Sequence, residues 1–128
     1  MSYYFSKTVN EDFDTAIERV TEELKKEGFG VLTQIDVQDT LKKKLDVDFK
    51  KYRILGACNP NFAYQALQLE DKIGSMLPCN IVVEENVDGT VEVSAVDPIA
   101  SMIGVKNDSL GGVAIQVSDK LKKVISNL

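Results

Sequence analysis

The sequence predicts a single α+β domain, residues 1–128, in which a mixed sheet packs against helices. Three observations support this class. Short segments of strand-type apolar residues are bounded by turn residues, and longer segments carry apolar residues at helical spacing. The two kinds follow one another in the order β-α-β-α-β-α-β-β-α. At 128 residues and 44% apolar content, the chain is also long enough to bury a core without disulfides or a metal.

The first strand and the first helix occupy the N-terminal part of the chain. Residues 3–9 alternate as a strand, with one face formed by Tyr3, Phe5 and Val9. Asn10 is placed to cap the following helix, and Gly28 is placed to end it. The apolar stripe of this helix consists of Phe13, Ala16, Ile17, Val20 and Leu24.

A second strand, a short helix and a third strand come next. Residues 31–35 form the strand, with one face made of Val31, Thr33 and Ile35. A short helix spans residues 36–45. Residues 52–58 are expected in the middle of the sheet, because both faces of this strand are apolar or small from Ile54 onward.

The next elements are a helix and a hairpin. Asn59 and Pro60 indicate the helix start, because an amide side chain can cap a helix and proline suits its first position. Two strands, residues 79–85 and 91–96, are joined by a turn at Asp88-Gly89, which is a strong hairpin signal.

The C-terminal part of the chain holds a short turn of helix after Asp97-Pro98 and then a long helix. The long helix has an apolar stripe made of Leu110, Val113, Ala114, Val117, Leu121, Val124, Ile125 and Leu128. At its start, Gly111 and Gly112 could let an anion approach free N–H groups, but they fit no phosphate-binding fingerprint. The favoured interpretation is that these glycines allow the helix to pack closely on the sheet.

Composition narrows the classes of partner. The formal net charge is −5, which disfavours nucleic acid as a partner, since nucleic-acid affinity depends on neutralising phosphates. No apolar run approaches the ~20 residues of a membrane span, and the N-terminus lacks the pattern of a secretory signal. We therefore expect a cytoplasmic protein with no membrane partner.

The chain contains no histidine, which removes the commonest general base and the commonest transition-metal ligand. A tetrahedral zinc site would have to combine the two cysteines with carboxylates, which is a poor ligand set for zinc. There is also no Cys-x-x-Cys pair. The sequence thus predicts no metal and no cofactor, and it disfavours most hydrolytic mechanisms.

Both cysteines occur in Cys-Asn pairs beside a proline. The segments are Gly56-Ala57-Cys58-Asn59-Pro60 and Leu77-Pro78-Cys79-Asn80. Together with Ala63, Ala66-Leu67 and Gly74 they resemble the domain-of-unknown-function 302 family, most specifically between residues 55 and 83 and in general pattern over most of the chain. The resemblance implies a sandwich-like α+β fold and dimers, and it implies no reaction or catalytic residues.

The spatial relation of the two cysteines depends on strand direction. If the strands that carry Cys58 and Cys79 run parallel, one sheet length separates the thiols; if they run antiparallel, the thiols can lie side by side at one sheet edge. Sequence leaves both alternatives open. A thiol near the start of the helix at Pro60 would also ionise more easily, because helix N-termini carry partial positive charge.

Three functions are compatible with these features. The first is a binding module for an unidentified small molecule, without turnover, whose cleft is formed by Cys58, Asn59, Pro60, Cys79, Asn80 and Asp97. The second is a thiol-dependent enzyme or redox sensor, with Cys58 as nucleophile and Cys79 as resolving partner. The third is a subunit-interaction domain that acts as a homodimer. A simpler interpretation of the thiols is inert buried cysteine. We favour the binding module.

Overall fold

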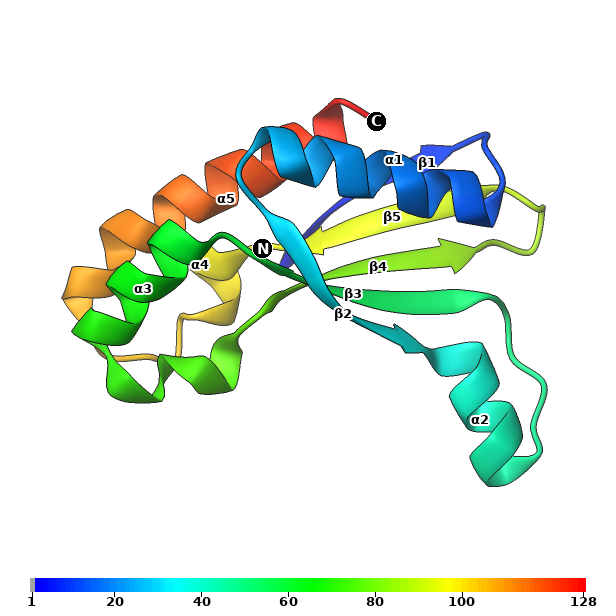
Figure 1. Ribbon diagram of the computed structural model, residues 1–128, viewed down its shortest axis with the longest axis horizontal. Coiled ribbons are helices and arrows are strands. Elements are labelled where there is room, and N and C mark those ends of the chain that lie inside the picture. Colours follow the sequence, from blue (N-terminus) through cyan, green and yellow to red (C-terminus); the bar gives the residue numbers. More distant parts are fainter. Residues whose placement is uncertain (1) are drawn as a thin grey trace.

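The computed structural model describes residues 2–128 (Figure 1). Its strands are β1 (Tyr4–Val9), β2 (Gly30–Asp36), β3 (Tyr52–Cys58), β4 (Cys79–Glu85) and β5 (Val91–Val96). Its α-helices are α1 (Phe13–Lys26), α2 (Val37–Leu45), α3 (Pro60–Leu69), α4 (Pro98–Ser101) and α5 (Gly111–Ser126). Two 3₁₀ segments are η1 (Asp71–Met76) and η2 (Asp108–Leu110). The predicted α+β class and order of elements are confirmed, and α4 is the short helical turn expected after the hairpin.

The five strands form one sheet in the order β1-β5-β4-β3-β2. Every neighbouring pair is antiparallel, so the sheet is not the mixed one expected from the sequence. The reason is the position of α3, which lies beyond the end of the sheet instead of crossing its face (Figure 1). The chain therefore turns round at that end, and β4 returns antiparallel beside β3.

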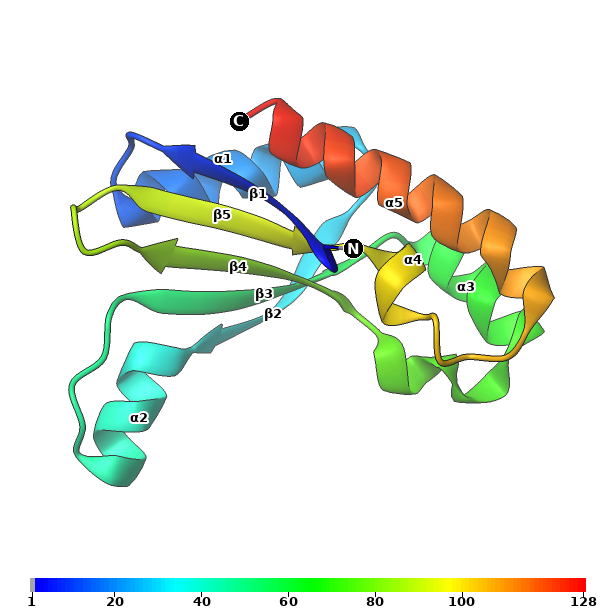
Figure 2. The same cartoon turned by 180° about the vertical axis from the view of Figure 1, so that it is seen from behind.

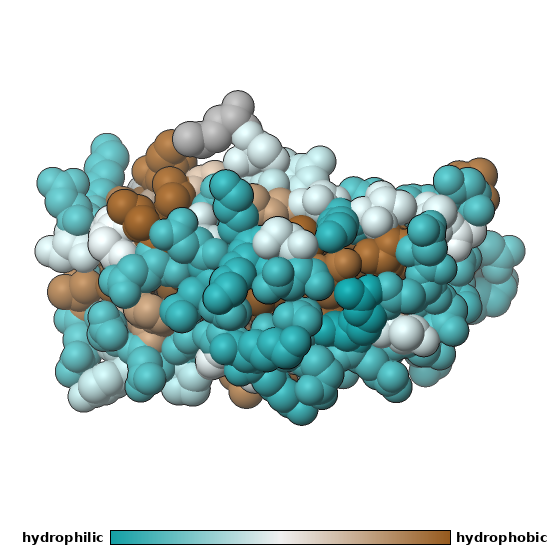
Figure 3. Space-filling view, turned by 90° about the horizontal axis from the view of Figure 1, so that it is seen from above, coloured by the Kyte–Doolittle hydropathy of each residue, from teal (hydrophilic) through white to brown (hydrophobic). Residues whose placement is uncertain are grey.

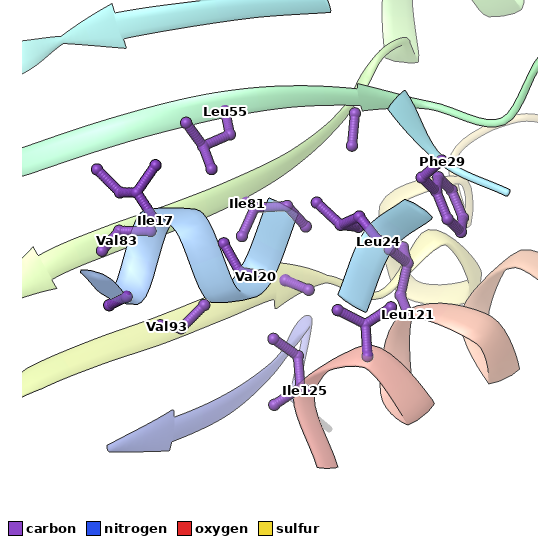
Figure 4. Packing of buried hydrophobic residues seen from close by; sticks show 14 of the residues in the cluster. Ile17, Val20, Leu24, Phe29, Leu55, Ile81, Val83, Val93, Leu121 and Ile125 are labelled. Atoms are coloured by element: carbon purple, nitrogen blue, oxygen red, sulfur yellow. The ribbon is translucent and has the colours of Figure 1, made fainter. Parts of the chain in front are cut away.

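Two helices, α1 and α5, cover one face of the sheet (Figures 1 and 2). The predicted apolar stripe of α1 is buried there, and Figure 4 shows it meeting side chains from β3, β4, β5 and α5. The main core consists of these helical stripes and the inward residues of the sheet, among them Leu55, Ile81, Val83, Val93, Leu121 and Ile125. Burying this apolar surface is the chief source of stability of the sheet layer.

The opposite face of the sheet carries no helix within residues 2–128 (Figures 1 and 2). Half-buried side chains such as Tyr52 and Val82 point from this open face. Helix α2 continues from β2 and projects away from the sheet layer (Figure 1), and none of its residues is buried. Among the described helices, none is long and apolar enough to cross a membrane.

Helix α1 ends at the residue expected from the sequence, but it begins at a different one. Asp12, not Asn10, is the N-cap, and its carboxylate accepts a hydrogen bond from the N–H of Thr15 at 2.8 Å. This bond also lowers the pKa of Asp12. At the C-terminal end, Gly28 adopts a φ of 86°, where a side chain would be strained. Its N–H bonds to the carbonyl of Lys25 at 3.0 Å, which ends the helix as predicted.

A bulge in β2 changes which of its residues share a face. Val31 lies opposite Ala57, but Thr33 lies opposite Gly56, so Leu32 is left without a partner on β3. The extra residue turns Thr33 and Ile35 toward the open face, while Val31 stays on the core side with Ala57. The prediction that Val31, Thr33 and Ile35 share a face is therefore wrong.

A second, smaller hydrophobic cluster lies beyond the end of the sheet, where α3, η1, α4 and η2 gather (Figure 2). Its fully buried members are Ala66, Ile73 and Leu110, and the partly buried residues around them are Leu77, Met102, Val105 and Val113. We call this set the end cluster. It is built from short segments, so it contains less buried surface than the main core and is expected to open more easily.

Candidate functional site

The antiparallel ladder between β3 and β4 brings the two cysteines together at one end of the sheet. Cys79 lies directly opposite Ala57, the residue before Cys58. Of the two arrangements that the sequence left open, the antiparallel one is correct. Both cysteines are free, and both line a single cavity that we call the seam cavity.

The seam cavity lies between the main core and the end cluster. Phe29 and Val117 reach it from the main core, whereas Leu77 and Met102 reach it from the end cluster. Phe62 of α3 and Pro98 of α4 complete its bulky walls. Its volume is about 30 Å³. The two clusters share no buried residue, and only the partly buried Val113 packs against both.

The walls of the seam cavity are almost entirely apolar. Among the described residues that line it, the polar side chains are the two thiols and the amide of Asn59. None of the lining residues is charged, so the cavity offers no partner to a charged ligand group, and burying such a group there without a partner would be costly.

Cys79 is buried, with 8% of its surface exposed, and Cys58 is half-buried. Burial, reinforced by the nearby Cys58, raises the pKa of the Cys79 thiol to about 11. A thiol with that pKa is protonated at neutral pH and is therefore a poor nucleophile and a poor metal ligand. Cys79 thus behaves chemically as a small apolar side chain that forms part of the cavity wall.

Asn59 lies at the N-cap position of α3, as predicted, but its side chain caps no N–H group of that helix. Instead its amide nitrogen donates to the carbonyl of Glu27 at 3.2 Å. A Cβ atom on Gly28 would come within 3.0 Å of the same nitrogen. The Asn59 side chain therefore ties the start of α3, which lines the seam cavity, to the end of α1.

The remaining predicted ligand residues lie outside the cavity. Pro60 is exposed at the first turn of α3. Asn80 is exposed on the open face, opposite Gly56, in a shallow depression shared with Tyr52 and Val82. The two Cys-Asn pairs thus bring their cysteines together but not their asparagines, because successive residues of a strand face opposite ways.

Asp97 is a structural residue that places the neighbouring cavity wall. Its carboxylate oxygen Oδ1 accepts hydrogen bonds from the N–H of Ile99 at 3.0 Å and from the hydroxyl of Ser118 at 2.9 Å. The first bond caps α4 and the second fixes α4 to α5. Through this contact Asp97 holds Pro98, the next residue, against the seam cavity.

The sequence patterns did not indicate that Met102, Pro98 and Ser118 lie at or beside the seam cavity. Met102 follows a short helix without a periodic pattern, and Ser118 sits among apolar residues of α5 as its one buried polar side chain. Helical spacing predicts which residues are buried, but it does not indicate where two buried clusters leave a gap. The Ser118 hydroxyl could be found from sequence only as an exception to the apolar stripe.

The two glycines at the start of α5 are not explained by close packing. A Cβ atom added to Gly111 or Gly112 would meet no atom within 4 Å. Their predicted role in bringing α5 close to the sheet is therefore wrong, since both glycines are exposed. Within residues 2–128, no group of three or more Cys, Asp or Glu side chains is placed to hold a metal ion.

Comparison with known proteins gives a family and a structural relative. The chain matches a family model described as a domain of unknown function, DUF302, over residues 5–128. Among solved structures it is similar to an uncharacterized conserved protein DUF302 from Bacillus stearothermophilus. The two share 30% sequence identity and a TM-score of 0.91, over 98% of this chain and 98% of that one. No curated protein matches the chain.

Proposed function

The chain belongs to the DUF302 family of domains of unknown function, and we propose that it binds a small apolar molecule in the seam cavity without turning it over. The observation that carries the proposal is the apolar lining of a cavity placed between two hydrophobic clusters. Small-molecule sites are typically concave and mostly apolar, with few polar groups.

The size of the cavity limits what the closed form can hold. A water molecule needs about 10–15 Å³ on this measure, so a cavity of about 30 Å³ has room for a molecule the size of two or three waters. Apolar cavities of this kind stay dry and take up small apolar molecules.

Two of the three polar groups at the cavity, the Cys79 thiol and the Asn59 amide, favour binding over catalysis. General acid–base work needs a group whose pKa lies near the working pH, and burial holds the Cys79 thiol in its protonated form. The Asn59 amide is engaged with the carbonyl of Glu27. Neither of these two groups is prepared to move a proton, which supports a binding role for the site.

The alternative function is thiol chemistry with Cys58 as nucleophile and Cys79 as resolving partner. The proximity of the two free cysteines at one cavity favours it. The raised pKa of Cys79 weighs against it, because a resolving thiol attacks as the thiolate. We therefore rank this function below apolar binding.

The test of apolar binding uses xenon under pressure, followed by the NMR shifts of methyl groups. We expect shifts at Ala57, Met102 and Val117, which line the cavity, and none at Val87, which is fully exposed on the β4–β5 turn. In Ala63→Leu, whose larger side chain fills the cavity from α3, these shifts should disappear. Ala100→Leu is the matched control, because Ala100 is half-buried on α4 and does not line the cavity. Equal shifts in both variants would refute the proposed site.

A second copy of the chain is the partner that we propose for the open face. Tyr3, Tyr4 and Ile35 are exposed around it, and the face carries both a basic and an acidic group, since Lys50 donates to Glu84 at 2.6 Å. A two-fold interface pairs one surface with itself, and because Lys50 already neutralises Glu84 within the chain, this pair adds no repulsion between two copies. Sedimentation should give a dimer for the wild type and a monomer for Val82→Glu. A wild-type monomer at high concentration would refute this partner.

A further inference from the structure

A second apolar concavity lies on the outer side of the end cluster, between α4 and the start of α5. We call it the outer groove; its volume is about 290 Å³. Three exposed isoleucines line it: Ile99, Ile103 and Ile115. Ile103 is 76% exposed, which is unusual for a side chain of its size beside other exposed apolar residues. In Figure 3, hydrophobic side chains also come to the surface at the end of the molecule that holds α3, α4 and the start of α5.

Two residues lie between the outer groove and the seam cavity and line both of them. Met102 and Ala114 line the groove on one side and the cavity on the other. Methionine is unbranched and has three rotatable side-chain bonds, so it changes rotamer at low cost. Its backbone N–H stays bonded to the carbonyl of Pro98 at 3.0 Å whichever rotamer the side chain adopts. Because this bond does not involve the side chain, Met102 can change rotamer without breaking α4.

We propose that the ligand of the seam cavity is a molecule with a single straight alkyl chain and an uncharged head group. This inference rests on the proposed function and names its ligand class. The end of the chain occupies the seam cavity, the middle passes Met102, and the rest lies along the outer groove. One elongated apolar molecule accounts both for a cavity too small for most ligands and for the exposed isoleucines beside it.

The polar side chains of the outer groove favour an uncharged head group over a charged one. Among the described residues that line it, only Asp108 is charged. The Asn107 amide is already engaged: its nitrogen donates to the carbonyl of Leu69 at 2.8 Å, and its oxygen accepts from the N–H of Ser109 at 3.1 Å. A carboxylate head group would meet the like charge of Asp108, with no cationic side chain in the lining to offset it, whereas a hydroxyl group can donate to Asp108. The groove therefore favours alcohols over fatty acids.

The test measures dissociation constants for 1-alkanols from butanol to octanol by isothermal titration calorimetry. Each methylene buried in the groove should tighten binding roughly fourfold. Ile103→Ser should weaken 1-octanol roughly tenfold and leave 1-butanol unchanged, because only the longer chain reaches residue 103. Val87→Ser is the matched control, since Val87 is an exposed apolar residue on the far β4–β5 turn. Equal affinity for all chain lengths would overturn the proposal.

The head group is tested with octanoate in place of 1-octanol. Octanoate should bind at least about threefold more weakly to the wild type, and Asp108→Asn should narrow that difference by removing the like charge. Tighter binding of octanoate than of 1-octanol, or a difference that Asp108→Asn leaves unchanged, would overturn the uncharged head group.

Xenon binding and alkanol binding together distinguish failure of the alkyl ligand from failure of the proposed function on which it rests. Xenon shifts at the seam cavity without chain-length dependence would leave apolar binding standing and overturn the alkyl ligand. Absence of both xenon shifts and alkanol binding would overturn both. If Ile103→Ser instead changes the sedimentation of the protein, a second copy covers the outer groove, and the alkyl ligand is likewise overturned.

Discussion

The ring of Pro78 lies against the backbone of Gly56, so that a Cβ atom on residue 56 would come within 2.7 Å of Cγ of Pro78. The same atom would also clash with Oγ1 of Thr33. Gly56 is therefore a position where β3 needs the absence of a side chain, because Thr33 of β2 and Pro78, the residue before β4, both lie against it. This contact fixes the strand ends that carry Cys58 and Cys79.

We expect Gly56→Ala to destabilise the protein by about 1–3 kcal/mol, the usual cost of overpacking. The free energy of unfolding, measured in urea, checks this. Gly30→Ala is the control, because Gly30 lies in β2 with no atom within 4 Å of an added Cβ. If the two variants are equally stable, Pro78 and Thr33 are free to move aside, and the strand ends are less rigid than the contact indicates.

Asn59 should stabilise the protein as a hydrogen-bond donor and not as a helix cap. Asn59→Asp keeps a good capping side chain but cannot donate to the carbonyl of Glu27. We therefore expect Asn59→Asp and Asn59→Ala to lose similar stability, about 0.5–1.5 kcal/mol for the lost bond. A substitution by aspartate that costs nothing in thermal unfolding would show that capping is the role of this residue after all.

The raised pKa of Cys79 makes stability depend on alkaline pH. Its pKa is about 11 in the folded protein against an ordinary value of 9.0, so the folded state holds the proton more strongly. This contribution is fully present below about pH 9 and is lost as the pH rises toward 11. Its size is about 2–3 kcal/mol, from 1.36 kcal/mol for each pKa unit.

Urea unfolding of the wild type and Cys79→Ala between pH 8 and about 11 tests this linkage. Other groups titrate in the same range, among them Tyr52, whose pKa is also raised by burial. The difference between the two proteins removes their effect. The stability advantage of the wild type should shrink as the pH rises, and an advantage that is constant with pH would contradict the burial of an uncharged thiol.

The two thiols should differ in their access to reagents. Cys58 is half-buried and Cys79 is buried, so iodoacetamide should modify Cys58 first in the native reduced protein. Mass spectrometry after digestion locates the modified residue. We expect Cys79 to react only when the protein is unfolded. Rapid modification of Cys79 in the native state would show that the seam cavity opens often, and it would raise the standing of thiol chemistry at this site.

The hydrogen bond between Ser118 and Asp97 should hold α4 against α5. Ser118→Ala removes the donor from a residue that is only 4% exposed, and we expect a loss of about 0.5–1.5 kcal/mol in the free energy of unfolding. Asp97→Asn is the matched variant, because the asparagine Oδ1 can still accept from Ser118 and from the N–H of Ile99. An equal loss in both variants would indicate that the charge of Asp97, and not its geometry, stabilises α4.

The sequence by itself determined the elements of this protein. The apolar stripes of α1 and α5, the glycine that ends α1 and the Asp88-Gly89 hairpin are local features, since each depends on residues within a few positions of one another. The same local patterns placed the two cysteines at strand ends. They also carried the resemblance to the DUF302 family, which the match over residues 5–128 confirms.

Only the tertiary structure decided how these elements meet. The position of α3 beyond the sheet made β3 and β4 antiparallel, which brought Cys58 and Cys79 together and turned Asn80 to the open face. The bulge at Leu32 and the bond from Asn59 to Glu27 depend on partners far away in the chain. The seam cavity has the same origin: it is a gap between two clusters, and a gap is a property of packing that no single segment encodes.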